Sequence, residues 1–270
     1  MKTKLLALLI LNVVALSSIS QSVNRSLSFP YLELNAYHSK PDVISFQVNQ
    51  AALCGIDHIG FGAFAERRFL LADAAYFNAA VAMPSHLGNF GLSIKYGGSK
   101  NFNESVLGLA YAREVGKKIK AGIQFNYYGY RIPAYPGAST ISSEAAIQIQ
   151  ILPQLRTGMS VVNPVGGKIG GDKLPSVYKL ALGYEPSDHF FAAISIIKEE
   201  GRPVNCIAGL QYQFADRFMA RIGMISESTS LYGGGGWGWN KFRVDVCVSY
   251  HAQLGYTPGI LFIVNGNSRK

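Results

Sequence analysis

The sequence predicts an all-β fold, a transmembrane antiparallel β-barrel. Its composition and the pattern of its residues lead to this expectation. The chain is 49% hydrophobic, contains 29 glycines and is only 15% charged, whereas soluble domains carry about 25% charged residues. Beyond the N-terminus, no second apolar run is long enough to span a membrane as a helix. Several segments alternate apolar and polar residues, which is the pattern of membrane-spanning strands of about 10 residues.

The first 20 residues have the features of a secretory signal peptide. Lys2 and Lys4 precede an apolar run from Leu5 to Leu16, and small polar residues follow. A spanning helix needs about 20 apolar residues, so this run is too short to be a membrane anchor. We therefore expect cleavage that leaves Gln21 at the mature N-terminus, with a cut a few residues earlier as the alternative. Export to the outer membrane of a Gram-negative bacterium is the expected location.

Period-two alternation is clearest from residue 118 to residue 151. Ile119, Ile123 and Phe125 occupy alternate positions, and Lys120 and Gln124 lie between them. Successive side chains of a strand point to opposite faces, so we expect one face to contact lipid and the other to line the lumen. Similar segments follow at residues 208–214 and 242–251. The predicted lumen-lining residues are Gln124, Asn126, Gln148, Gln150, Gln211, Gln213, Arg243 and Asp245.

Short breaks typical of turns separate the alternating segments, among them Gly97–Lys100, Pro186–Asp188 and Gly201–Pro203. Their spacing predicts about 14 strands between residues 56 and 265, an even number, as in single-chain bacterial barrels. Residues 266–270 are left as a C-terminal tail. We expect residues 164–173 to form a long loop, and Gly233–Gly236 to form a strand or a loop.

Residues 21–55 do not follow the alternating scheme, although Val43–Val48 could form a short strand. This predicts a segment that precedes the barrel, lying either along the periplasmic side or in the lumen as a plug. It ends in a short motif just before the first long strand. The residues of this plug motif are Asn49, Gln50, Ala51 and Ala52.

Aromatic residues mark the expected lipid–water interfaces. Tyr127 and Tyr130 lie near the end of one predicted strand, and Trp237 and Trp239 near the end of another. Aromatic girdles at both interfaces are typical of membrane barrels. By the alternation, Tyr127 faces lipid and Tyr128 the lumen. Packing in the core of a soluble β-sandwich is the alternative reading of these aromatic residues.

The charge and the cysteines narrow the expected partners. Removing residues 1–20 lowers Lys+Arg from 25 to 23 and leaves Asp+Glu at 16, so the formal charge falls from +9 to +7. The basic residues are scattered, and export makes nucleic acid an unexpected partner, so outer-membrane lipid or an anionic solute is expected instead. Cys54, Cys206 and Cys247 have no metal-ligand spacing and are expected to be apolar fillers, with one disulfide left open.

No pattern in the sequence points to catalysis. The histidines are isolated from one another, and neither a nucleophile elbow, a zinc-binding helix nor a phosphate loop is present. The run Gly233–Gly236 has no lysine and no following helix, so phosphate binding is not expected there. We therefore expect a protein that is not an enzyme and that holds no cofactor and no metal.

The start of the predicted barrel resembles that of a known family. The plug motif is followed by Ile59–Gly62 and Glu66–Phe69, and together these resemble the beginning of the PorV/PorQ family of FadL-like outer-membrane β-barrels. Looser similarity continues to about residue 265. The sequence departs from the family's Asn-Pro-Ala step, because Gln50 stands in place of proline, and the chain is shorter than the FadL-like transporters.

The resemblance implies two functions for the same barrel. The PorV/PorQ family is associated with the type IX secretion system of Bacteroidetes, which implies a non-enzymatic subunit that binds secretion-system proteins. The alternative is a FadL-like transporter that moves a hydrophobic or amphipathic small-molecule ligand across the outer membrane. We expect the first of these.

Overall fold

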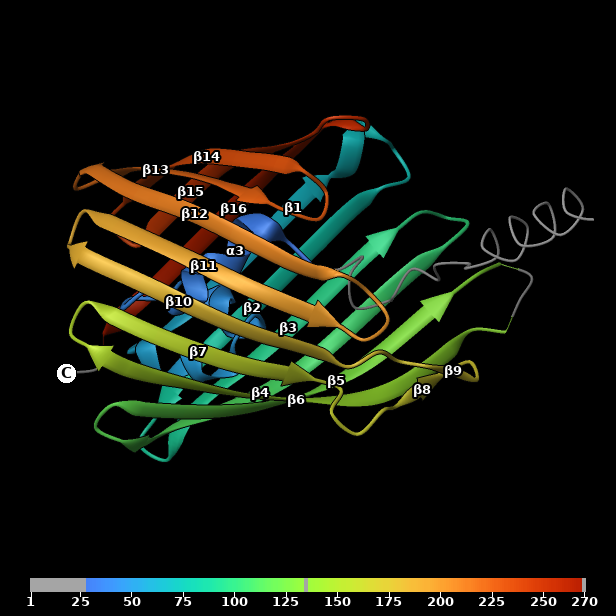
Figure 1. The fold of residues 1–270 in the computed structure, drawn as a ribbon, viewed down its shortest axis with the longest axis horizontal. Coiled ribbons are helices and arrows are strands. Elements are labelled where there is room, and N and C mark those ends of the chain that lie inside the picture. Colours follow the sequence, from blue (N-terminus) through green and yellow to red (C-terminus); the bar gives the residue numbers. More distant parts are fainter. Residues whose placement is uncertain (1–27, 134–135, 269–270) are drawn as a thin grey trace, which may run out of the picture.

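Fourteen antiparallel strands close into a barrel (Figure 1) in a computed structural model that describes residues 28–133 and 136–268. Strands that are consecutive around the barrel are also consecutive along the chain, and β1 pairs with β16 to close it. The predicted fold and strand number are therefore confirmed. The predicted signal peptide at residues 1–20 lies outside the described residues.

The barrel strands are bounded as follows. They are β1 (His58–Arg67), β2 (Ala75–Ser85), β3 (Gly88–Gly98), β4 (Asn103–Gly116), β5 (Ile119–Arg131), β6 (Ala138–Leu152), β7 (Leu155–Val162), β10 (Val177–Ser187), β11 (Phe190–Glu199), β12 (Val204–Ala215), β13 (Phe218–Ile225), β14 (Ser230–Trp239), β15 (Phe242–His251) and β16 (Gly255–Ser268). The strand β14 includes the run Gly233–Gly236, and β16 continues past residue 265, where we expected the barrel to end.

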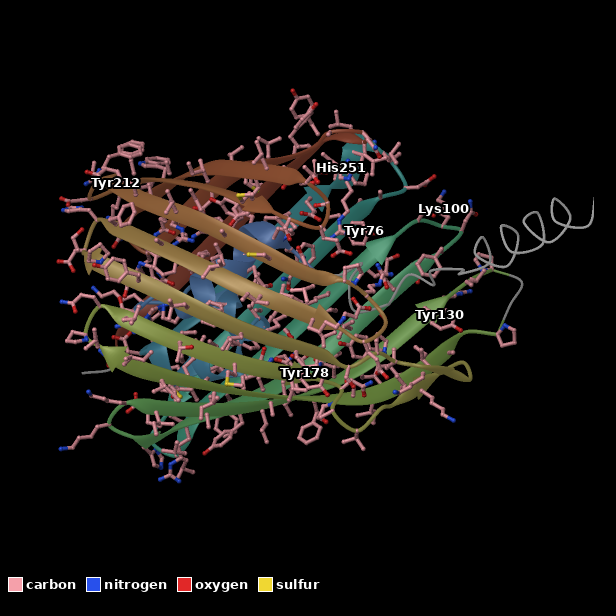
Figure 2. The ribbon with its side chains drawn as sticks, viewed as in Figure 1. Tyr76, Lys100, Tyr130, Tyr178, Tyr212 and His251 are labelled. Atoms are coloured by element: carbon pink, nitrogen blue, oxygen red, sulfur yellow. The ribbon has the colours of Figure 1, made fainter. Side chains whose placement is uncertain are left out.

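The alternation of apolar and polar residues in the sequence corresponds to an alternation of exposed and buried side chains in the structure. On β5 the side chains of Ile123, Phe125 and Tyr127 are 46%, 54% and 51% exposed, whereas Gln124 and Asn126 are almost fully buried on the opposite face. Large apolar side chains are exposed in this way on every barrel strand, and they cover the outer surface in Figure 2. Such a surface is stable only in lipid, so the barrel spans a membrane.

The two ends of the barrel differ in their connections. At one end, which we name the short-turn end, six hairpins are joined by two residues each, as at Pro153–Gln154 between β6 and β7. At the other end, which we name the long-loop end, the connections are longer and include η4 (Arg68–Leu70). Figure 2 places Tyr212 near the short-turn end and Lys100, Tyr130 and His251 near the long-loop end.

The segment before β1 folds inside the barrel as a plug (Figure 1). It consists of α3 (Pro30–Glu33), η1 (Leu34–Tyr37), η2 (Val43–Gln47) and η3 (Gln50–Gly55). The short strand expected at 43–48 is wrong, because this stretch forms the 3-10 helix η2, whose backbone hydrogen bonds stay within the plug. None of the described helices is long and apolar enough to cross a bilayer.

Glycines on the inner wall leave room for the plug. A Cβ atom at Gly158 would lie 2.6 Å from the Tyr37 ring, and one at Gly183 would lie 2.6 Å from the Tyr37 carbonyl oxygen. A Cβ atom at Gly91 would lie 2.8 Å from the ring of Phe46. Both aromatic side chains are fully buried, so the plug and the wall fit only because these wall positions have no side chain.

The long loop expected at 164–173 contains a small hairpin, β8 (Lys168–Ile169) paired with β9 (Asp172–Lys173). Asn163 starts the loop in a left-handed conformation (φ 54°), and its side chain donates to the Leu174 carbonyl at 2.7 Å. Ile169 and Leu174 are buried against Val106 and Tyr128 on the inner wall. The loop therefore folds inward over β4 and β5 and narrows the long-loop end of the lumen.

Candidate functional site

A cavity of about 650 Å³ lies in the long-loop half of the lumen. Its walls are inward-facing residues of many strands, and its mouth is formed by loop residues such as Phe69, Leu71 and Leu254. Its floor is the plug, through Leu32, Ile44 and other residues. The cavity therefore opens between the long loops and ends inside the barrel.

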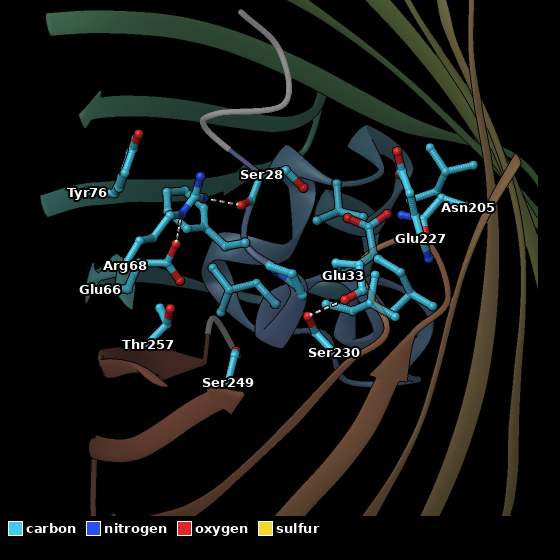
Figure 3. Close-up of a pocket in the computed structure, with 18 of the residues that line it drawn as sticks. Ser28, Glu33, Glu66, Arg68, Tyr76, Asn205, Glu227, Ser230, Ser249 and Thr257 are labelled. Carbon is cyan, nitrogen blue, oxygen red and sulfur yellow. Dashed lines mark hydrogen bonds and ion pairs between the residues drawn. The ribbon is translucent and has the colours of Figure 1, made fainter. Parts of the chain in front are cut away.

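The cavity lining mixes apolar and charged groups. Apolar side chains come from the plug and from the wall, including Val177, Ile207 and Ile225. Charged groups alternate with them, and Figure 3 shows Glu66 and Arg68 on one side of the cavity and Glu227 on the other. Such a lining contacts both the apolar body and a polar group of an amphipathic molecule.

Arg68 joins the plug to the mouth of the cavity. Its Nε donates to the Glu66 carboxylate at 2.6 Å, and its Nη2 donates to the Ser28 carbonyl at 2.7 Å (Figure 3). The guanidinium also lies 4.1 Å from the ring centroid of Tyr76 and 6.0 Å from that of Phe29. Ion pairing and cation–π contacts together fix this side chain beside the cavity.

A second ion pair lies deeper in the cavity lining. Lys179 on β10 donates to Glu33 of the plug at 2.8 Å, and both residues line the cavity. Lys95 and Glu144 line the same region. The cations and carboxylates of this region balance, which reduces the cost of burying them.

The plug motif lies in the lumen against β4, β5 and β6. Asn49 caps η3, because its side chain accepts a hydrogen bond from the Ala51 amide at 3.1 Å, and its Nδ2 donates to the Met159 carbonyl at 3.3 Å. Gln50 donates to Glu144 at 2.7 Å. Ala52, like the other three residues of the motif, is buried. The motif thus attaches the end of the plug to the wall, and any role in transport remains a prediction.

Four of the predicted lumen residues form the polar inner wall around this attachment. Asn126 donates to Glu144 at 2.5 Å and accepts from Gln124 at 2.6 Å. Gln148 donates to the carbonyl of plug residue Ala36 at 2.7 Å. Gln211 accepts from Arg221 at 2.7 Å. These side chains do face the lumen, but their hydrogen bonds are to other protein groups, and none of the four lines the cavity.

A charged cluster holds the middle of the plug to β13 and β15. Asp42 of the plug accepts two hydrogen bonds from Arg243, at 2.6 and 2.5 Å, and Asp245 accepts from the same guanidinium at 2.9 Å. Arg221 lies 3.9 Å from Asp42 and donates to the Tyr31 carbonyl at 2.9 Å. The predicted lumen residues Arg243 and Asp245 therefore belong to the attachment of the plug.

Glu185 on β10 forms a third attachment, at the short-turn end. Its carboxylate accepts from the Ser39 amide at 3.0 Å and from the Ser39 hydroxyl at 3.0 Å. Arg156 on β7 donates to the same carboxylate, and the His38 ring nitrogen lies 3.0 Å from it. One wall carboxylate thus fixes the turn between η1 and η2.

The remaining predicted residues lie at the rims of the barrel. Gln150 and Gln213 face inward but donate to carbonyls of the short turns. Trp237 and Trp239 are exposed on the outer face at the short-turn end, with ring centroids 6.3 Å apart. Both tryptophans therefore have the position expected of interface aromatics.

Tyr130 is not an interface aromatic. It lies three residues from Tyr127, and because side chains alternate along a strand, it faces inward. There it packs against Ile169 and Leu174 of the folded loop, and its hydroxyl lies 2.5 Å from a Cβ atom placed at Gly170. The predicted place of Tyr130 at the lipid–water interface is therefore wrong, because Tyr130 occupies an inward-facing position of β5.

Sequence reasoning missed the charged residues that attach the plug and line the cavity. Lys179, Arg221 and Glu144 stand at inward positions of alternating strands, so the alternation could have assigned them to the lumen. Their partners Glu33 and Asp42 stand in the plug, which has no repeating pattern. Nothing local to these two residues indicates what they contact.

No group of three or more His, Cys, Asp or Glu that could hold a metal occurs in the part of the chain that the structure describes. Within that part Cys54, Cys206 and Cys247 are free thiols. The disulfide left open by the sequence is therefore not formed.

Known proteins were compared with the chain by sequence and by structure. No family model and no curated protein matches it. The deltaS2 mutant of the monoaromatic hydrocarbon channel TodX aligns with a TM-score of 0.62 and 9% identity, covering 87% of this chain and 100% of that one. The Pseudomonas putida toluene transporter TodX gives 0.61 and 8%, covering 89% and 96%. A Pseudomonas aeruginosa FadL homologue gives 0.57 and 11%, covering 84% and 94%.

At identities this low, the comparison shows that the fold is similar and shows nothing more. These structures give no support to the PorV/PorQ family or to a source in Bacteroidetes, to which the sequence resemblance pointed. The closed barrel of 14 antiparallel strands with a short helical segment on its N-terminal side matches them. The chain therefore has the fold of the FadL-like outer-membrane β-barrels.

Proposed function

We propose that this protein is a non-enzymatic transporter that carries hydrophobic or amphipathic small molecules across the outer membrane. The observation that carries the proposal is the cavity of about 650 Å³, which opens between the long loops and ends on the plug. Ligand pockets typically have volumes of about 300–1,000 Å³ and a mostly apolar lining with a few polar groups. The cavity has a volume in this range, and its lining combines apolar side chains with more charged groups than such pockets usually carry.

The orientation of the barrel supports uptake. Outer-membrane barrels place their short turns in the periplasm and their longer loops outside the cell. The cavity opens at the long-loop end, so a ligand from outside reaches it first. The similar fold of a toluene transporter and a monoaromatic hydrocarbon channel agrees with the passage of hydrophobic molecules.

Passage beyond the cavity requires the plug to move. Tyr37, Phe46 and Leu53 are fully buried between the cavity and the short-turn end. The plug is held by discrete polar contacts to the wall, at Glu185, Arg243 and Lys179. Ion pairs and hydrogen bonds of this kind can break and re-form, so the attached plug is the closed state of the transporter.

Filling the cavity tests the proposal. Ser249 faces inward on β15 and lines the cavity (Figure 3), so Ser249→Trp places an indole in the path without touching the plug motif. We expect uptake of radiolabelled toluene and of a fluorescent amphiphile by expressing cells to fall for at least one of the two probes. The matched control is Val246→Trp on the outer face of the same strand, where the side chain is 63% exposed.

Two results would contradict the proposal. One is equal uptake of both probes by three kinds of cells: those that express Ser249→Trp, those that express Val246→Trp and those that lack the protein. The other is stoichiometric recovery of a secretion-system partner from native membranes, with failed cargo export in its absence and unchanged uptake. That second result would favour the secretion-associated function that the sequence resemblance implies, for which the described residues carry no specific observation.

A further inference from the structure

The outer surface of the barrel is hollowed over strands β11 to β14. The hollow has a volume of about 830 Å³ and is lined by residues of β10 to β15. Its small outward-facing residues are Ala192, Ala208 and Gly233, and large side chains such as Met224 and Tyr250 stand around them. It lies on the lipid-facing side of the wall, away from the ligand cavity.

Contacts within the protein do not require glycine at the outer positions of β14. A Cβ atom at Gly233 would have no neighbour closer than 3.6 Å, and one at Gly235 none closer than 3.7 Å. The inward-facing Gly234 differs, because a Cβ atom there would lie 2.8 Å from the ring of Tyr31 in the plug. The inner glycine is needed for the plug, whereas the outer two leave space in the outer surface that no protein atom fills.

A track of small residues leads from the hollow toward the short-turn end. Ala220 on β13 pairs with Gly235 on β14, one outward position beyond the hollow. The next outward pair is Phe218 and Trp237. Exposed aromatic residues surround the end of this track, namely Tyr212, Phe214, Phe218, Trp237, Trp239 and Phe242. Aromatic girdles of this kind lie at the level of the lipid headgroups.

Cations lie just beyond the girdle. Arg217 in the turn between β12 and β13 is exposed, as is Lys241 in the turn between β14 and β15. The Gly238 amide donates to the Arg217 carbonyl at 2.7 Å, so the first turn lies against β14. Asp216 is the one acidic residue of these two turns. The net charge favours an anionic headgroup at this interface.

The lining of the hollow selects an apolar occupant. It contains no charged residue, and its outward-facing polar side chains are those of Tyr184 and Tyr250. A second copy of the chain that docked with the two-fold axis through this face would place one hollow opposite the other. Two facing hollows leave a void and lose van der Waals contacts. A flexible hydrocarbon chain fills the same space.

We propose that the hollow and its track bind one acyl chain of an anionic glycerophospholipid whose headgroup lies at Arg217 and Lys241. The site is separate from the ligand cavity, so it does not depend on the proposed transport.

Photocrosslinking tests the site. The full-length protein is reconstituted in phosphatidylglycerol vesicles that contain a trace of phosphatidylglycerol with a diazirine on its acyl chain, and crosslinked peptides are mapped by mass spectrometry. We expect crosslinks to concentrate on residues 217–239. The double variant Gly233→Leu with Gly235→Leu fills the hollow and is expected to lose them. In Gly129→Leu, another outward glycine with 3.6 Å to its nearest neighbour, they are expected to remain.

The headgroup is tested separately. Arg217→Gln with Lys241→Gln is expected to reduce crosslinking in phosphatidylglycerol vesicles to the level seen in phosphatidylcholine vesicles. Folding of each variant is verified by the shift between heated and unheated samples on a gel. Crosslinks spread evenly around the barrel, or retained by the double leucine variant, would overturn the proposal. The proposal would also be overturned if the wild-type protein were a dimer and the double leucine variant a monomer. The occupant of the hollow would then be a second copy of the chain.

Discussion

Asp42 is the plug residue with the most charged partners on the wall. It contacts Arg243 and Arg221, which also contact Asp245 and Gln211. Burial favours the protonated acid and raises its pKa, but the charge and hydrogen bonds of Arg243 and the charge of Arg221 lower the pKa below its usual value. Asp42 is therefore charged at neutral pH and ties the plug to β13 and β15.

The substitution Asp42→Asn is expected to loosen the plug. It leaves the buried guanidinium of Arg221 and the partly buried one of Arg243 with one carboxylate fewer, and breaking a buried pair in this way costs up to about 3–5 kcal/mol. We expect larger single-channel conductance in planar bilayers and faster protease cleavage within residues 28–56. The control is Lys40→Gln, because Lys40 is exposed at the short-turn side of the plug. Equal conductance of the two variants would show that the cluster does not hold the plug.

Acid is expected to have the same effect as this substitution. A carboxylate whose folded pKa is lowered contributes stability above its unfolded pKa, about 3.9, and that stability is lost as the pH falls through the folded value. Conductance of the native protein should thus stay low from neutral pH down to the ordinary range of aspartate and rise below it. Asp42→Asn should show a weaker rise over the same range. A rise of the same size in both would assign the acid effect to another group.

The two faces of one strand are expected to respond differently to the same side chain. Val246 is 63% exposed to lipid in the middle of β15, and an arginine at midplane depth costs about 2–4 kcal/mol. Ser249 faces the cavity three residues later, so Ser249→Arg should cost much less. Urea unfolding of both variants in lipid vesicles measures the difference. Equal losses of stability would mean that the outer surface does not face hydrocarbon.

The plug elements pack against the barrel wall at glycine positions, where the wall has no side chain. The plug element η1 brings Tyr37 against Gly158, at a distance that leaves no room for a Cβ atom. Strand propensity favours Val over Gly in an isolated strand. The glycine is therefore explained by the plug, which contacts it across the lumen.

Gly158→Val is expected to displace η1 and leave the barrel intact. The new side chain would overlap the Tyr37 ring, and the wall is held by β-ladder hydrogen bonds that do not involve the plug. Hydrogen exchange should rise in residues 28–56 and stay low in β7. Gly129→Val is the matched control, since its Cβ atom has 3.6 Å of space on the outer face. Faster exchange throughout the barrel would show that plug and wall unfold together.

For the whole molecule, the closed barrel predicts how the protein behaves in cells and on gels. All fourteen strands pair with two neighbours, which leaves no free sheet edge. Unheated protein is expected to run faster than heated protein, and the protein should sediment with the outer membrane. Recovery in the soluble periplasmic fraction, with one mobility on gels, would contradict a membrane-spanning barrel.

Period-two alternation determined which residues of the strands face lipid and which face the lumen, because the direction of a side chain in an extended backbone is a local property. It predicted the inward direction of Gln124 and Arg243 and the outward direction of Tyr127, whereas the spacing of the turn residues predicted the number of strands. It also showed that residues 21–55 are not strands of the barrel. The error at Tyr130 came from grouping aromatics by nearness in sequence and not by face.

Only the tertiary structure decided where the plug lies and what the lumen residues contact. Glu33 and Lys179 are 146 residues apart, and Asp42 and Arg243 are 201 residues apart, so no local pattern joins them. Closing the barrel brings distant strands around one lumen, and the shape of that lumen then selects the conformation of a segment with no periodicity of its own. The cavity exists for the same reason, as the space that the folded plug leaves at the long-loop end.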